Sequence, residues 1–337
     1  MPKRIAPKTE TMKLLFSVLI ASFYGLTIRL LYGFFSELMP LMGVVFFFFV
    51  PFLIGYLTVI LLPYKEEHTA GGAFFKPWLT CGVILLVTLC FNIEGAICWA
   101  MALPVFGVLS GLGGLAAFSR KSRRSLRKKE WDFEKDDWEK PGSLKVSFLF
   151  LIPLLAGAIE GNRTSSFEKL SVEKQVEIKA SPETVWNALL SNNQTDVKRR
   201  GFTFSSFFGF PHHLNTTTGN LAVGGSRVAN YEKGLTFMET IEKIEPGRSL
   251  VLAIKTDPSK ISKAIMDEHI VIGGEHVQMQ QDEYQLEELS GGRTRLTLSS
   301  RFSINTPFNW YAGIWSKWLM SDILQEELNA VRAISGK

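Results

Sequence analysis

The chain has 337 residues, of which 46% are hydrophobic and 20% are charged, and it contains 26 phenylalanines. Its 37 basic and 32 acidic residues give a formal charge of +5, and the basic excess lies before residue 162, since the remainder is neutral. The apolar first half excludes an ordinary soluble protein. The neutral second half, which has no basic runs, gives no indication of nucleic-acid binding.

Five apolar stretches in residues 1–161 predict a multi-pass transmembrane domain. They lie at about 14–34, 38–62, 77–92, 96–118 and 145–160, and about 20 apolar residues are needed to cross a bilayer as a helix. The first is predicted to be an uncleaved anchor, because it is too long for a secretory signal peptide and lacks a small-x-small cleavage site. The fifth is short, and a position on the membrane surface is its alternative.

The connections between these stretches alternate in basic charge. Lys and Arg gather at the N-terminus, around Lys65 and Lys76, and in the run 120–129, whereas the connections at 36–37 and 92–95 contain none. Basic loops remain on the cytoplasmic side. The N-terminus is therefore predicted to be cytoplasmic and the part after residue 161 extracytoplasmic, in the plasma (inner) membrane. If the fifth stretch does not cross, that part is cytoplasmic instead.

Arg29 and Glu94 are candidate polar residues within the membrane. An ionisable group inside a span is expensive to bury and is a functional candidate by default. One hypothesis pairs the two residues in the outer leaflet. The alternative is that Arg29 extends its side chain to the interface and Glu94 lies in an exposed turn.

After a linker at 162–170 the pattern changes to short alternating runs, which predict an α+β domain over 171–337. This domain contains no cysteine, so its core alone must stabilise it. A strand is predicted at 172–178, a helix at 183–190 after Ser181-Pro182, and a long C-terminal helix at 307–335. Further strands are predicted at about 203–207, 227–232, 236–244, 249–255, 277–287 and 293–304.

Several segments of this domain resemble the SRPBCC superfamily, which includes START, Bet v 1-like and polyketide cyclase/dehydrase-like domains. The similarity lies in residues 176–186 (VEIKASPETVW), in Gly225-Ser226-Arg227, and in residues 238–246 and 291–296, and it covers about residues 170–335. The resemblance implies a helix-grip fold, in which a curved antiparallel sheet grips the last helix around an apolar cavity. It does not imply a reaction, because this fold supports binders, transfer proteins and enzymes.

The apolar residues of the last strands and the last helix are the predicted wall of that cavity. Those on the helix recur at helical spacing, so the alternative is that they are ordinary core. A third possibility is that Trp310 or Trp315 contacts the membrane interface. The pocket candidates are Tyr284, Leu296, Leu298, Phe302, Tyr311, Trp315 and Trp318.

Histidines at 212, 213, 269 and 276 are the remaining candidates for chemistry, because a histidine beside a carboxylate can act as an acid–base pair. No metal-binding spacing is present, and the simpler interpretation places them in loops or at the surface. No catalytic residue, metal or cofactor is predicted.

The predicted function is binding of a hydrophobic or lipid-like ligand beside the bilayer, with no protein partner identified. The alternatives are a hydrolase- or cyclase-type enzyme acting on such a ligand, and a sensor that signals through the basic loop. An enzyme should place convergent polar groups in the cavity, whereas a simple binder should place almost none.

Overall fold

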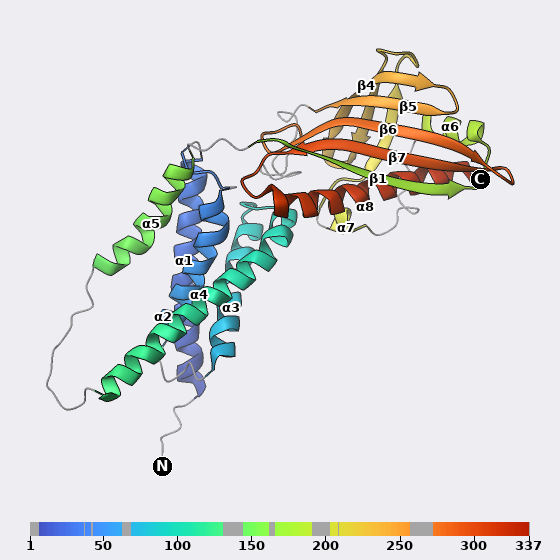
Figure 1. The fold of residues 1–337 in the computed structure, drawn as a ribbon. Coiled ribbons are helices and arrows are strands. Elements are labelled where there is room, and N and C mark those ends of the chain that lie inside the picture. Colours follow the sequence, from blue (N-terminus) through green and yellow to red (C-terminus); the bar gives the residue numbers. More distant parts are fainter. Residues whose placement is uncertain are drawn as a thin grey trace. The chain divides into compact units, whose positions relative to one another are not determined.

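Figure 1 shows the computed structural model, which describes residues 7–36, 38–41, 43–62, 69–130, 144–161, 166–190, 203–207, 209–256 and 272–336. The chain divides into two compact units, one formed by Met1–Glu94 with Trp99–Thr164 and the other mainly by Ser165–Lys337. Each unit has its own buried residues.

The first unit is helical in its described residues. A π-helical turn, Val45–Phe49, leads directly into the second helix. The helices are α1 (Pro7–Phe34), α2 (Val50–Ile60), α3 (Ala70–Cys90), α4 (Ala96–Glu130) and α5 (Leu144–Glu160).

Three stretches of the described chain, and not the five predicted, are long and apolar enough to cross a membrane. They are Thr11–Phe34 in α1, Ala70–Cys90 in α3 and Ala96–Arg123 in α4. The apolar helix Val45–Ile60 is shorter than the stretch predicted at 38–62, because the described residues 38–41, including Pro40, do not join it. The fifth predicted stretch forms α5, which has 17 residues and contains Pro153, fewer than the roughly 20 that a span usually needs.

The third predicted stretch differs in its start. α3 begins at Ala70 rather than near residue 77, because the Thr69 hydroxyl caps it by accepting a hydrogen bond from the Gly72 N–H at 3.1 Å. Such a cap satisfies a backbone donor that the first turn leaves without a partner. Lys76, which the sequence places in a loop, therefore lies inside the helix. The predicted turn at 92–95 is present between α3 and α4, with Asn92 at a φ of 51°.

Small residues of α4 allow it to pack closely on α2 and α3. A Cβ atom added at Gly113 would lie 1.9 Å from the Phe52 carbonyl oxygen, and one at Gly114 would lie 2.1 Å from that of Ala73. A hydrogen bond of 2.9 Å also joins the Thr58 and Thr80 hydroxyl groups of α2 and α3. Small residues and hydroxyl bonds of this kind are typical of helix association in membranes.

The second unit is built on a seven-stranded antiparallel sheet in the order β1-β7-β6-β5-β4-β3-β2, with α8 against one face of the curved sheet (Figure 1). α8 contacts β1 and β7. The strands are β1 (Glu168–Ile178), β2 (His213–Thr218), β3 (Ser226–Tyr231), β4 (Thr236–Glu245), β5 (Ser249–Lys255), β6 (Val277–Leu289) and β7 (Arg293–Ile304). The helices are α6 (Pro182–Leu190), α7 (Phe204–Phe207) and α8 (Asn309–Ser335).

These elements confirm the predicted helix-grip arrangement and correct some of its parts. The strands predicted from 227 to 304 are present as β3 to β7, and Gly291 and Gly292 make the β6–β7 turn with φ values of 80° and 67°, which glycine adopts without steric cost. The strand predicted at 203–207 is wrong: residues 204–207 form the short helix α7, where the Ser205 N–H donates to Asp322 Oδ2 of α8 at 2.8 Å. β1 also begins inside the predicted linker.

The end of the sheet formed by β1 and β7 packs tightly on α8. Leu296, Leu298 and Phe302 alternate along β7 and are at most 1% exposed, as the period of two predicted. Gly313 of α8 lets the helix approach, since a Cβ there would lie 3.7 Å from Ile304 and 3.8 Å from Leu170. Because β1 and β7 pack directly on α8, a cavity in this unit can lie only beneath the other strands of the sheet.

Candidate ligand-binding cavity

A cavity with about 520 Å³ of empty space, part of it open to solvent, lies between α8 and the sheet from β2 to β6. Most of its wall is apolar, but five of the lining side chains are polar. The apolar residues are Phe210, Ala229, Phe237, Ile254, Ile272, Met279, Met320, Ile323 and Leu324. The polar residues are His213, Tyr231, Glu239, Asp282 and Glu327.

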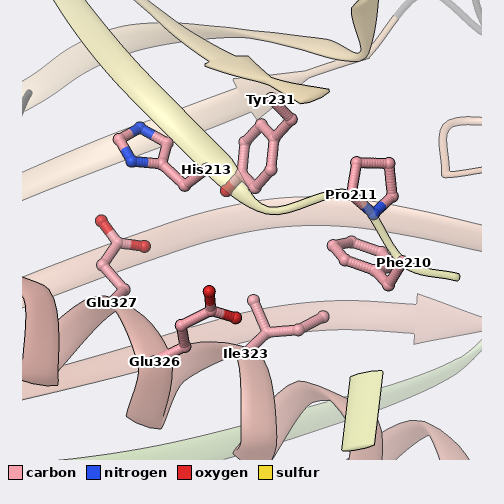
Figure 2. Close-up of a pocket in the computed structure, with 7 residues that line it drawn as sticks. All are labelled: Phe210, Pro211, His213, Tyr231, Ile323, Glu326 and Glu327. Carbon is pink, nitrogen blue, oxygen red and sulfur yellow. The ribbon is translucent and has the colours of Figure 1, made fainter. Parts of the chain in front are cut away.

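A smaller recess of about 270 Å³ shares part of this wall. Figure 2 shows its residues: Glu326 and Glu327 extend from α8, while His213 and Tyr231 lie on the side of the sheet. Phe210 and Pro211, in the segment before β2, line the recess as well (Figure 2). Both hollows thus combine apolar walls with carboxyl groups.

The strand register explains why the carboxyl groups point inward. Arg227 of β3 is opposite Glu239 of β4, and Asp282 of β6 is opposite Leu252 of β5 and Ser300 of β7. Directly opposed residues share a face of the sheet. On α8, Met320, Ile323, Leu324 and Glu327 follow helical spacing, so they share one face of the helix.

Glu239 and Arg227 form a buried ion pair, with Arg227 Nε 3.5 Å from Glu239 Oε2 and the two side chains 2% and 11% exposed. Among the described residues, Glu239 Oε2 and the Nε and Nη1 atoms of Arg227 have no hydrogen-bond partner. Burial raises the pKa of Glu239 to about 7, although the Arg227 charge acts in the opposite direction. The pair is therefore incompletely satisfied.

Asp282 lines the same cavity. Burial raises the pKa of its carboxyl group to about 8; the charges of Glu327 and Glu239 add to the rise, whereas the Ser300 hydroxyl group and the Arg227 charge act in the opposite direction. Its Oδ1 atom has no hydrogen-bond partner in the described part of the chain. Groups that lose or gain a proton near neutral pH are the ones that acid–base catalysis uses.

Two tyrosines complete the polar part of the wall. Tyr284 of β6 donates its hydroxyl hydrogen to Glu327 Oε1, and Tyr231 packs edge-on against His213 and Phe237 with ring centres 5.2 and 5.0 Å apart. Burial raises the pKa of both tyrosines well above the usual value. Both therefore remain protonated, and the Tyr284 hydroxyl group already donates its hydrogen to Glu327.

The histidines separate into different environments. His213 lines the cavity, with Nε2 2.9 Å from Thr216 Oγ1, while Nδ1 of His212 lies 2.5 Å from Glu326 Oε1. Nδ1 of His276 lies 2.9 Å from the Asn305 carbonyl oxygen. His269 lies outside the described residues. Within the described chain no three His, Cys, Asp or Glu side chains are close enough to hold a metal ion together.

The predicted pocket residues lie beside this cavity rather than among its lining residues. Tyr284, Leu296, Leu298 and Phe302 are buried in the sheet, and Tyr284 reaches the wall through Glu327. Tyr311 and Trp315 are partly buried on α8, and Trp318 is 40% exposed.

The sequence did contain a signal for the carboxyl groups that were missed. Glu239 has apolar neighbours two positions away on each side, Phe237 and Ile241, and both are buried. Glu327 likewise follows Ile323 and Leu324 at helical spacing. A charged residue within an apolar periodic pattern indicates a polar group on the buried face.

In the first unit, the structure brings the two polar candidates together. Arg29 Nε of α1 donates to Glu94 Oε1, and the side chains are 10% and 13% exposed. A second, longer bond of 3.4 Å joins Arg29 Nη2 to the Ile93 carbonyl oxygen.

No protein-family model and no curated protein matches the sequence. Solved structures similar to the chain include an aromatase/cyclase, Zhui, from Streptomyces sp. R1128, with 17% identity and a TM-score of 0.33 over 50% of this chain and 94% of that chain. A START superfamily protein from Mycobacterium smegmatis has 15% identity and a TM-score of 0.32, over 48% and 94%. Norcoclaurine synthase from Thalictrum flavum has 12% identity and a TM-score of 0.33, over 50% and 87%.

Each of these matches covers about half of this chain. Similarity at this level does not indicate an activity for this chain. The sheet order and α8 themselves define the second unit as a helix-grip domain.

Proposed function

We propose that this protein is a membrane-attached binding protein whose helix-grip domain holds a mainly apolar small molecule in the cavity between α8 and β2–β6. The observation that carries the proposal is the cavity wall, in which nine apolar side chains surround a few polar ones. Ligand sites of this composition bind the body of a ligand by apolar contact and orient it through the polar groups.

Membrane attachment is supported by the surface of the first unit. Phe16, Phe23 and Leu86, in the apolar helices α1 and α3, are more than 60% exposed, and a bilayer would cover such side chains without cost. We propose that the shorter helices also cross, which gives five spans, a cytoplasmic N-terminus and an extracytoplasmic helix-grip domain.

The contacts of the first basic residues after the fourth span support this orientation. Lys121 Nζ donates to the carbonyl oxygens of Val59 and Leu62 at the end of α2, and Arg120 Nη1 donates to the Tyr56 hydroxyl at 2.8 Å. The basic run thus begins beside the C-terminal end of α2, where positive charge is stabilising. Basic residues collected at one end of the helices favour that end for the cytoplasm.

A second candidate function is acid–base catalysis on the bound molecule, of the hydrolase or cyclase kind. It is favoured by the pKa values of Glu239 and Asp282, about 7 and 8, because such carboxyl groups can both give and take a proton near neutral pH. Convergent polar groups in the cavity were the feature expected of an enzyme.

The binding proposal is tested by filling the cavity. Ile323→Trp places a large side chain in the cavity wall, whereas Ile314→Trp is the matched control on the same helix, since Ile314 is 63% exposed. The full-length protein in lipid nanodiscs is exposed to a total lipid extract and examined by native mass spectrometry. We expect a retained small molecule in wild type and in Ile314→Trp but not in Ile323→Trp. Equal retention in both variants, or no retention by wild type, would contradict the proposal.

A further inference from the structure

The carboxyl groups around the cavity outnumber the cations that face them. Three of them, Glu239, Asp282 and Glu327, here called the carboxyl trio, line the cavity wall. Arg227 pairs with Glu239, while in the described chain Asp282 and Glu327 form no ion pair with a basic side chain. A nearby fourth carboxyl group, Glu326, is already paired with His212. The wall therefore carries an excess of negative charge whenever the trio is ionised.

Two oxygen atoms of the trio also lack hydrogen-bond partners among the described residues: Glu239 Oε2 and Asp282 Oδ1. A buried carboxylate oxygen without a donor is unfavourable, because it has lost its hydrogen bonds to water. Folding alone leaves these acceptors unsatisfied, and a donor that entered the cavity would satisfy them.

The geometry favours an organic cation over a metal ion as this donor. Among the described residues no three His, Cys, Asp or Glu side chains form a group that could hold a metal ion, and a Ca²⁺ ion needs six to eight oxygen ligands at about 2.3–2.6 Å. The aromatic rings of Tyr231, Phe237 and Phe210 line the same cavity, and aromatic faces attract ammonium groups.

We propose that the cavity binds an apolar amine, whose protonated amino group lies within the carboxyl trio and whose apolar body contacts the surrounding aromatic and aliphatic wall. This inference rests on the proposed function of the cavity and adds the chemical class of the ligand. The amino group supplies donors to the free oxygen atoms and balances the excess charge.

The binding of an amine is then linked to proton release. With pKa values near 7 and 8, Glu239 and Asp282 carry protons for much of the time at neutral pH. An ammonium group favours the ionised carboxylates, so its binding strengthens as pH rises toward the pKa of the amine, about 10 for an alkylamine. The other titratable groups around the trio are Arg227 and Tyr231 on β3, Tyr284 on β6, His213 on β2 and Glu326 on α8.

The test compares three probes that differ only in their head group: octylamine, 1-octanol and octanoate. Each is titrated calorimetrically into the full-length protein in nanodiscs of zwitterionic lipid, with empty nanodiscs subtracted, at pH 6 and pH 8.5. We expect octylamine to bind at least about tenfold more tightly than octanol at pH 8.5, with a smaller preference at pH 6 and the weakest binding for octanoate.

Asp282→Asn should remove most of the preference for octylamine over octanol. Glu283→Gln, the matched control on the same strand, should change neither, because Glu283 alternates to the other face and pairs with Arg301 at 3.8 Å. Glu327→Gln provides a second variant if Asp282→Asn does not fold, as judged by circular dichroism.

The outcomes separate the two proposals. Equal binding of octanol and octylamine, preference for octanoate, or equal effects of Asp282→Asn and Glu283→Gln would overturn the amine inference and leave apolar binding intact. Failure of all three probes to bind would overturn the proposed function itself.

Discussion

Arg29 and Glu94 lie 65 positions apart in the sequence, yet the Arg29 Nε–H donates directly to a carboxylate oxygen of Glu94. Only 10% and 13% of the two side chains are exposed. The pair ties α1 to the turn that follows α3. A charge pair in an apolar helical unit is favourable only while both partners are present, because removing one leaves an unpaired buried charge.

This relationship predicts the outcome of a charge-reversal cycle. Arg29→Glu and Glu94→Arg should each destabilise the first unit by about 3–5 kcal/mol, and the double variant should recover a large part of that loss. The measurement is the free energy of unfolding of the full-length protein in nanodiscs. Additive losses in the double variant would mean that the two residues act independently.

The close approach of α4 to α2 gives a second prediction. A Cβ at Gly113 would overlap the carbonyl oxygen of Phe52 at 1.9 Å, so Gly113→Ala must separate the two helices. We expect a loss of about 1–3 kcal/mol, seen as a lower unfolding temperature in nanodiscs. Gly82→Ala in α3 is the matched control, because nothing lies within 4 Å of its added Cβ. If the two variants were equally stable, the tight packing of α4 on α2 would be refuted.

Orientation is tested by reporter fusions. The distribution of basic residues predicts that a fusion at Ser122 reports the cytoplasmic side and that fusions after Gly161 and at Lys337 report the exterior. The readout is a pair of reporters that are active on opposite sides of the membrane. A cytoplasmic signal at Lys337 would mean that α5 does not cross and would reverse the side of the helix-grip domain.

The order of elements in the second unit could be predicted from the sequence because local signals and tertiary contacts agree there. In β7, the apolar residues Leu296, Leu298 and Phe302 alternate, and the strand is buried on one face as that pattern indicates. β2 was missed because its first two residues, His213 and Leu214, belong to a stretch of the sequence, 207–214, that is rich in Phe, Gly and Pro and favours a loop. Its pairing with β3 overrides that local preference.

The position of Asp282 in the cavity could not be predicted in the same way. Asp282 follows an irregularity in the pairing of β6 with β7, between Met279 and Gln281, and such a bulge reverses which residues of a strand face inward. Only the register shows that Asp282 faces the cavity and Glu283 the outside. On α8, Gly313 allows close packing near the predicted residues Tyr311 and Trp315, whereas the lining residues of the cavity begin at Met320.

The carboxyl groups of the cavity also predict how stability depends on pH. In the folded state the pKa of Asp282 is raised from 3.8 to about 8 and that of Glu239 from 4.5 to about 7, in both cases mainly by burial. A carboxyl group with a raised pKa binds its proton more tightly when folded, so folding is most favoured below the unfolded pKa, and this advantage is lost as pH rises through the folded pKa. These two groups therefore lower stability progressively between about pH 4 and pH 8.

The variant Asp282→Asn isolates the contribution of Asp282, the larger of the two, to the dependence of stability on pH. The amide does not titrate, so the unfolding temperature of the helix-grip domain should fall less between pH 5 and pH 8 than in wild type, and the variant should be the more stable protein at pH 8. The measurement is thermal unfolding of the full-length protein in nanodiscs, followed by circular dichroism at each pH. Glu283→Gln should retain the wild-type slope, because that residue lies on the opposite face of β6. Parallel curves for wild type and Asp282→Asn would show that the Asp282 carboxyl group titrates alike in the folded and unfolded states, and its burial against the cavity would then be wrong.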